Sequence, residues 1–179
     1  VELLVALGFV ISFYYFQFSL TTLLFFVLTV FFVIIFFIDL KHFIIPNELT
    51  FPLMFIGFLK SFDPNINQYL FPNYINSIIG GVIGYFVIWF IIFIYKKLRN
   101  KEGMGLGDAK LLSAIGFWFG WISIPFVLFF SSLVALCFAI PSLMNKSKTM
   151  SSKIPFGPYL VLGCILYVSL LEKIILFLD

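Results

Sequence analysis

Two aspartates are candidate catalytic residues, because each lies at the edge of a long apolar run. Asp39 follows the run FFVIIFFI, and Asp108 follows the glycines of GMGLG and precedes another apolar run. Two carboxyl groups in one partly desolvated site do not both ionise easily, so the pKa of one is raised. One group can then activate water as a base while the other donates a proton. Together the pair predicts an aspartic peptidase, whereas either aspartate alone is more simply explained as a helix-end residue, Asp108 as an N-cap.

The other ionisable and metal-binding residues favour no different catalytic chemistry. The single histidine, His42, follows Lys41 in a polar loop, which excludes a His-Glu-x-x-His metalloprotease helix. The two cysteines, Cys137 and Cys164, lie singly in apolar runs, where Cys behaves as a small apolar side chain. Without a Cys-x-x-Cys pair, we expect no zinc module and no metal site in this sequence.

The elements that must position the two aspartates are long apolar segments. The chain is 63% hydrophobic and only 11% charged, a composition that cannot cover the surface of a soluble domain. Because a helix needs about 20 apolar residues to cross the hydrocarbon core, we expect an all-α, polytopic integral membrane protein with about seven transmembrane helices. The full-length runs are Ser19–Ile38, Ile75–Tyr95, Trp121–Leu143 and Pro158–Leu178, and the shorter ones are Leu3–Phe16, Leu49–Leu59 and Ala109–Gly120. No linker divides them, so residues 1–179 are predicted to form one membrane-embedded domain.

The basic residues predict the orientation of these helices. If every run crosses once, the loops 39–48, 96–110 and 144–157 lie on one side. They hold nine of the 11 basic residues, namely Lys41, Lys96, Lys97, Arg99, Lys101, Lys110, Lys146, Lys148 and Lys153. Basic loops mark the cytoplasmic face, so we expect both aspartates to face the cytoplasm. The net charge of +3 then indicates contact with the lipid bilayer rather than with nucleic acid.

Several neighbours of the aspartates are expected to shape the loops or bind a substrate. Glycines at 103, 105 and 107 would let the backbone adopt positive φ and approach a bound peptide closely. Pro46 would end one element before Asn47 caps the next. Lys110, two residues after Asp108, could tune the charge of that carboxylate or meet lipid phosphate. The set of these residues is Pro46, Asn47, Gly103, Gly105, Gly107 and Lys110.

Three sequence blocks resemble the type 4 prepilin leader peptidases, which are polytopic aspartic peptidases of the Gly-x-Gly-Asp class. The blocks are IDLKHFIIPNELT at 38–50, GMGLGDAKLLSAIGFWFG at 103–120 and KIPFGPYLVLG at 153–163. The resemblance implies that Asp39 and Asp108 are catalytic. It also implies that Pro155 and Gly157 belong to a wall beside the site, which the two prolines of the third block keep from being a continuous helix. The implied reaction is removal of the leader of a type 4 prepilin or pseudopilin at the inner membrane of a bacterium.

The sequence departs from the larger bacterial members of that family. Those members carry a preceding span and a cytoplasmic loop with paired Cys-x-x-Cys motifs, and they methylate the mature pilin with S-adenosylmethionine. Neither feature is found in these 179 residues. We therefore expect a peptidase that needs no cofactor and lacks the upstream span and zinc loop. S-adenosylmethionine would be used only if methyltransferase activity is retained, and we expect little of that activity.

Two other functions stay open at the level of sequence. A presenilin-like or preflagellin-type peptidase shares the Gly-x-Gly-Asp motif and would act on other substrates. A small transporter or channel component would use Asp39 and Asp108 to relay ions or protons, as intramembrane carboxylates often do. A transporter is expected to show an internal repeat of broken spans, and we find no convincing repeat.

Overall fold

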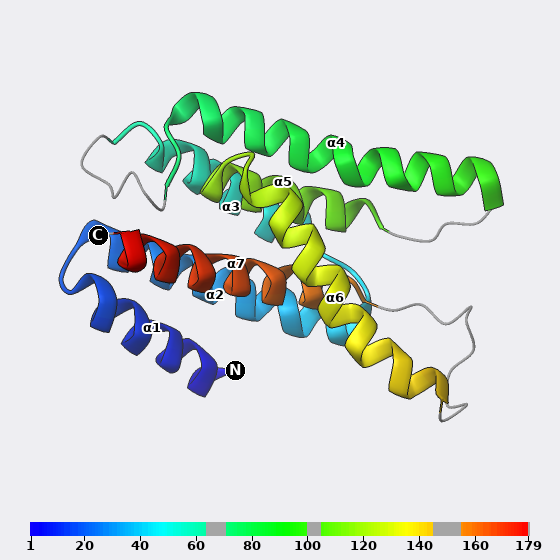
Figure 1. The fold of residues 1–179 in the computed structure, drawn as a ribbon, viewed down its shortest axis with the longest axis horizontal. Coiled ribbons are helices and arrows are strands. Elements are labelled where there is room, and N and C mark those ends of the chain that lie inside the picture. Colours follow the sequence, from blue (N-terminus) through cyan, green and yellow to red (C-terminus); the bar gives the residue numbers. More distant parts are fainter. Residues whose placement is uncertain (64–70, 100–104, 145–154, 179) are drawn as a thin grey trace.

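The computed structural model describes residues 1–63, 71–99, 105–144 and 155–178, and these residues form seven helices with no strand. Each of the predicted apolar runs corresponds to one helix, so the all-α prediction is confirmed for the described residues. The helices are α1 (Glu2–Phe16), α2 (Leu20–His42), α3 (Asn47–Lys60), α4 (Tyr74–Arg99), α5 (Leu106–Phe119), α6 (Ser123–Met144) and α7 (Gly157–Leu178) (Figure 1).

Among the described residues, two helices are long and apolar enough to cross a membrane, judged by length and composition. They are α2, over Leu20–His42, and α4, over Tyr74–Leu98. Shorter apolar stretches lie in α1, α6 and α7. The membrane character predicted from composition is thus supported for two helices, and the count of seven crossings stays a prediction.

Helix α4 presents aromatic side chains outward rather than into the core. The side chains of Phe86, Phe90 and Phe93 are each more than half exposed, although apolar side chains are usually buried in soluble proteins. Contiguous apolar surface of this kind marks a face that contacts lipid or another apolar partner. The outer face of α4 is therefore suited to the interior of a bilayer.

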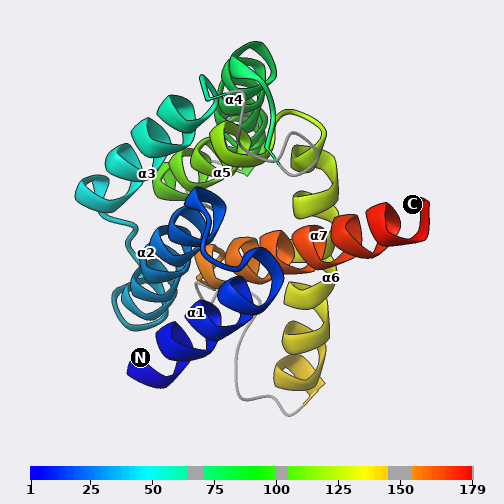
Figure 2. The same ribbon diagram turned by 90° about the vertical axis from the view of Figure 1, so that its left-hand side faces the viewer.

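Helix α5 lies at the centre of the fold and is almost completely buried. Leu111, Leu112, Ile115 and Trp118 have no exposed surface. Figure 2 shows α5 flanked by α3 and α4. A Cβ atom on Gly116 would clash with the backbone of Gly80 in α4, so the two backbones approach each other closely here. Small residues allow such close helix packing in membrane proteins.

The far end of α5 is tied to its neighbours by three hydrogen bonds. Lys60 Nζ donates to the backbone oxygen of Trp118 at 2.8 Å, and Trp118 Nε1 donates to the backbone oxygen of Leu53 at 2.8 Å. Ser77 Oγ of α4 donates to the backbone oxygen of Phe117 at 2.7 Å. The last carbonyls of a helix lack intrahelical donors, so Lys60 and Ser77 satisfy two of these carbonyls and hold the end of α5 against α3 and α4.

The end of α2 and the starts of α3, α5 and α7 meet at one end of the bundle, on the right in Figure 1. Helix α4 extends beyond the start of α5 at the same end. This end holds both candidate aspartates, which therefore lie on helices that reach it from opposite chain directions.

Candidate active site

Asp39 lies in the last turn of α2 and is only 4% exposed. The helix ends at His42, and the next residue, Phe43, adopts a left-handed conformation with φ 57° and donates its N–H to the backbone oxygen of Asp39 at 2.9 Å. The side chain of Asp39 accepts a hydrogen bond from the backbone N–H of Gly157, with 3.0 Å between nitrogen and Oδ2. The carboxylate thus points towards the start of α7.

Asp108 is the third residue of α5 and is 7% exposed. The alternative explanation of Asp108 as an N-cap does not hold, because Gly105 is the N-cap residue and Asp108 lies in the first turn. Its backbone N–H donates to the oxygen of Gly105 at 3.2 Å. A carboxylate in the first turn is favoured by the partial positive charge of the helix N-terminus.

The structure brings the two aspartates into one buried site. Both side chains are buried, and Ile45 lies next to Gly107, the neighbour of Asp108, and next to Gly157, the hydrogen-bond donor to Asp39. Two carboxyl groups so placed and poorly hydrated titrate as a pair rather than independently. Such a pair can hold one proton and one negative charge, which is the state that acid–base catalysis on a peptide bond requires.

Ile45, in the loop between α2 and α3, packs between the starts of two helices. A Cβ atom on Gly107 would lie 2.9 Å from Ile45 Cβ, and one on Gly157 would lie 3.0 Å from Ile45 Cδ1. Glycine is therefore needed at 107 for close approach. The expected positive φ is wrong for the described glycines of this loop, since Gly105 has φ −86° and, of the described glycines, Gly120 alone has positive φ. Gly103 lies outside the described residues.

Asn47 and Lys110 connect the starts of α3 and α5. Pro46, with φ −66° and ψ 143°, is the N-cap of α3, so the prediction that Asn47 caps this helix is wrong. Instead, Asn47 Oδ1 accepts a hydrogen bond from Lys110 Nζ at 2.6 Å. Lys110 Nζ also lies 5.5 Å from the centre of the Phe51 ring. The lysine therefore links α5 to α3, a contact that its place in the sequence did not indicate.

Pro155 and Phe156 precede α7, and the helix begins at Gly157. Pro158 fits in the first turn because the N–H groups there have no intrahelical acceptor. The expected non-helical wall thus ends at Phe156, while Gly157 is already helical and buried against Asp39. The sequence resemblance implies that Gly157 lies near the site, but its bond to Asp39 was not predicted. The glycine between Pro155 and Pro158 is the feature of the sequence that could have indicated it.

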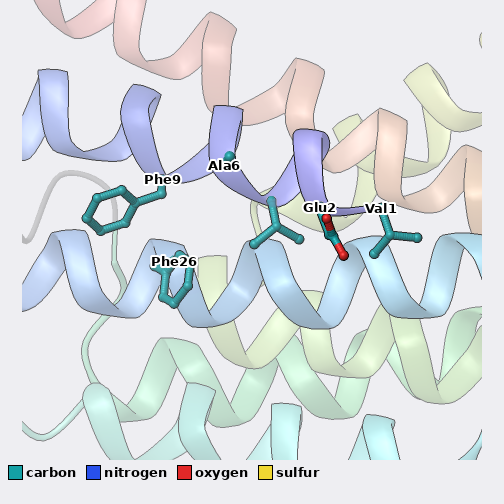
Figure 3. Close-up of a pocket in the computed structure, with 6 residues that line it drawn as sticks. Val1, Glu2, Ala6, Phe9 and Phe26 are labelled. Carbon is teal, nitrogen blue, oxygen red and sulfur yellow. The ribbon is translucent and has the colours of Figure 1, made fainter.

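The described residues contain no group of three or more His, Cys, Asp or Glu side chains placed to hold a metal ion. A surface pocket lies between α1 and α2, as Figure 3 shows, and its lining is almost entirely apolar. It is lined by Val1, Glu2, Val5, Ala6, Phe9 and Phe26. None of the predicted site residues lines it, so the candidate site is the carboxylate pair and not this pocket.

Residues 26–140 match the profile of the type IV leader peptidase family, and this range includes both aspartates. A protein of Aeromonas salmonicida (strain A449) named prepilin leader peptidase/N-methyltransferase is 41% identical over 130 residues, which are 71% of this chain and 42% of the relative. Proteins with the same name from Pseudomonas aeruginosa and Escherichia coli (strain K12) are 35% and 34% identical over 127 and 137 residues. These matches cover 70% and 76% of this chain.

The chain spans less than two thirds of the length of these relatives, with 42% of the Pseudomonas protein and 58% of the Escherichia protein covered. No solved structure gives a significant match. The family match over residues 26–140 covers α5 and most of α2, the helices that carry the two aspartates.

Proposed function

This chain belongs to the type IV leader peptidase family, and from that premise we propose that it is an aspartic endopeptidase that removes the N-terminal leader of type 4 prepilins or pseudopilins. The observation that carries the proposal is the burial of both Asp39 and Asp108 at the end of the bundle where α2 ends and α5 and α7 begin. Each relative named above is a prepilin leader peptidase/N-methyltransferase. The substrate class is taken from that name and applied here as a proposal.

In the proposed reaction the two carboxyl groups share the acid and base roles. One carboxylate removes a proton from water as the water oxygen bonds to the scissile carbonyl carbon, while the other carboxyl group donates its proton to the carbonyl oxygen. The C–N bond then breaks, the leaving nitrogen takes the proton gained by the first group, and the second group regains its own from the tetrahedral intermediate. Because base and acid both come from the chain, we propose that cleavage requires no cofactor.

The proposed topology is a multi-pass protein of the bacterial inner membrane with its site facing the cytoplasm. Lys41, Lys96, Lys97 and Lys110 belong to the end of the bundle that carries the aspartates. Basic residues are retained on the cytoplasmic side during insertion. The apolar helix of a prepilin would lie against exposed apolar faces such as that of α4, with its polar leader at the basic end.

Methyl transfer is not part of this proposal. The relatives are named for both activities, but the chain corresponds to only 42% or 58% of their length. The described site offers an acid–base pair, which serves hydrolysis. We expect S-adenosylmethionine to have no effect on the rate of cleavage.

The test is to incubate the purified protein, in detergent or in vesicles, with a prepilin and to detect loss of the leader by mass spectrometry. The proposal expects cleavage by the native chain and none by Asp108→Asn. Cleavage of a preflagellin or of unrelated membrane helices, but not of prepilins, would favour the alternative peptidase functions. Undiminished cleavage by Asp108→Asn would overturn the aspartic mechanism.

A further inference from the structure

The carboxylate of Asp39 is held by a residue far away in sequence. The backbone N–H of Gly157, the first residue of α7, donates to Asp39 Oδ2 at 3.0 Å, and the bond is buried. Asp39 lies near the end of α2, so this one bond joins two helices at the site. Hydrogen bonds to a charged group are stronger than those between neutral groups.

At the start of α7, the backbone N–H of Gly157 is available to donate to a group outside the helix. Pro158 has no N–H, and the N–H groups of Tyr159 and Leu160 both donate to the backbone oxygen of Phe156 at 3.1 Å. The first N–H groups of a helix have no acceptor within the helix, and they carry its partial positive charge. The N–H of Gly157 therefore meets a carboxylate where the helix itself offers no partner.

The contact also requires that residue 157 have no side chain. A Cβ atom there would lie 2.7 Å from Asp39 Oδ2, 3.2 Å from Asp39 Cγ and 3.0 Å from Ile45 Cδ1. Carbon and oxygen atoms that are not bonded do not approach so closely, so the carboxylate would have to turn away. Asp39 is only 4% exposed, which leaves its side chain little room to do so.

We propose that Gly157 is a positioning residue for catalysis: its main-chain N–H fixes Oδ2 of Asp39, which leaves Oδ1 to face the attacking water. Helix α7 thereby completes the site, which α2 and α5 alone do not orient. This inference rests on the proposed peptidase function, and it adds a residue that touches neither water nor substrate but sets the direction of one that does.

The first test is Gly157→Ala, measured by steady-state cleavage of a prepilin. A small misplacement of a catalytic group can lower the rate about 10²-fold, so kcat is expected to fall by roughly that factor. KM is expected to change little, because the added methyl group meets Asp39 and Ile45 inside the protein. A purely structural effect would instead lower the amount of folded enzyme and leave kcat per folded molecule unchanged.

Gly163→Ala is the matched control on the same helix. Its added Cβ would clash with Ser131 Oγ and the backbone oxygen of Val127 in α6, so it disturbs the packing of α7 without touching Asp39. We expect a lower Tm with kcat close to that of the native chain. If Gly163→Ala lowers kcat as much as Gly157→Ala, the effect is one of helix packing and the inference is wrong.

A second substitution, at Ile45, distinguishes the effect of the contact with Asp39 from that of the contact with Ile45. Ile45→Val removes Cδ1, which relieves one of the contacts of the methyl group that Gly157→Ala adds, but not its contact with Asp39 Oδ2. The double variant is therefore expected to stay as impaired as Gly157→Ala. Recovery of native kcat would show that the glycine serves only to accommodate Ile45.

An ester in place of the amide between Phe156 and Gly157 removes the N–H without adding a side chain. The kcat of this variant tests the inference even if Gly157→Ala does not fold. Because hydrogen bonds to charged groups are strong, kcat is expected to fall at least about tenfold. Native kcat in the ester variant, with Asp39→Asn inactive, would reject the inference and leave the proposed function standing. Native cleavage by Asp39→Asn would reject the proposed function itself.

Discussion

Asp39 and Asp108 are the residues on which the proposed reaction depends, because each supplies one proton-transfer step. Asp→Asn keeps the size of either side chain but removes its ability to exchange a proton. Each single substitution is expected to reduce prepilin cleavage to background while expression and Tm stay close to native. The double substitution is expected to be no worse than either single one, because residues that act as a unit are not additive. Cleavage measured by mass spectrometry, with Tm measured in detergent, checks both expectations.

Glu48→Gln is the matched control for these substitutions. Glu48 is an exposed carboxylate in the first turn of α3, close in sequence to Asp39. Removing its charge is expected to leave cleavage largely intact. If Glu48→Gln abolishes cleavage while Asp39→Asn does not, the wrong carboxylates have been assigned.

The two described glycines before Asp108 differ in the room around them. A Cβ on Gly107 would lie 2.9 Å from Ile45 Cβ, whereas the nearest atom to a Cβ on Gly105 is 3.8 Å away, the backbone nitrogen of Gly107. We therefore expect Gly107→Ala to lower cleavage by more than Gly105→Ala. Gly107→Val, with a β-branched side chain, is expected to lower it further. Equal activities of the two alanine variants, compared at equal amounts of folded enzyme, would contradict this steric account.

At the residue scale, the sequence predicted which residues gather at the site better than how they contact one another. The spacing of apolar runs placed Asp39 and Asp108 at the same end of the molecule, because the direction of each helix follows from the one before it. The hydrogen bonds of Asn47 and Gly157 were not predictable. Each joins residues of two helices that are distant in sequence, so it depends on how the helices pack and rotate.

At the scale of helices, the hydrogen bond between Lys110 and Asn47 joins the starts of α5 and α3. Lys110→Met keeps most of the apolar side chain but removes the donor, and Asn47→Ala removes the acceptor. Each is expected to lower Tm by about 2–4 °C, as for the loss of one modest interaction in a chain of this size. The double variant is expected to lose less than the sum of the two.

Thermal unfolding of the four proteins in one detergent measures this coupling. Glu48→Gln combined with Lys110→Met serves as the control pair, since Glu48 is not the residue that binds Lys110 and its effect is expected to add. Strict additivity of Asn47→Ala and Lys110→Met would mean that the two side chains do not interact in the membrane protein.

Helix length explains why the sequence predicted the seven helices but not how many of them cross the membrane completely. With 26 residues, α4 is about 39 Å long and exceeds the roughly 30 Å of the hydrocarbon core. Helices α3 and α5 have 14 residues each, or about 21 Å, and so are shorter than that core. An apolar run predicts burial equally well in lipid and among other helices. Helix α5 is almost completely buried among other helices. Its sequence alone is equally compatible with a short membrane span, so this burial could not be predicted.

At the scale of the whole molecule, α4 is longer than α5 and extends past its start. The carboxylate pair therefore lies further into the bundle than the basic end of α4. Helix α4 extends past the start of α5 in Figure 1, and its last turns carry Lys96 and Lys97. If the end of α4 lies at the cytoplasmic surface, Asp108 lies at a depth where water is scarce. A site there would meet the scissile bond of a substrate at the point where its apolar helix leaves the bilayer.

The orientation of α4 can be tested with one cysteine at each end of this helix. Lys97 and Tyr74 are both exposed, and the helix between them is the longest candidate span. In a background with Cys137→Ser and Cys164→Ser, Lys97→Cys is expected to react with an impermeant thiol reagent only after the cytoplasmic side is opened. Tyr74→Cys is expected to react in intact spheroplasts, because the basic end of the helix is retained inside. Labelling of Lys97→Cys from outside would place the aspartates on the wrong side for a cytoplasmic leader. Failure to label Tyr74→Cys from outside would show that α4 does not cross the membrane.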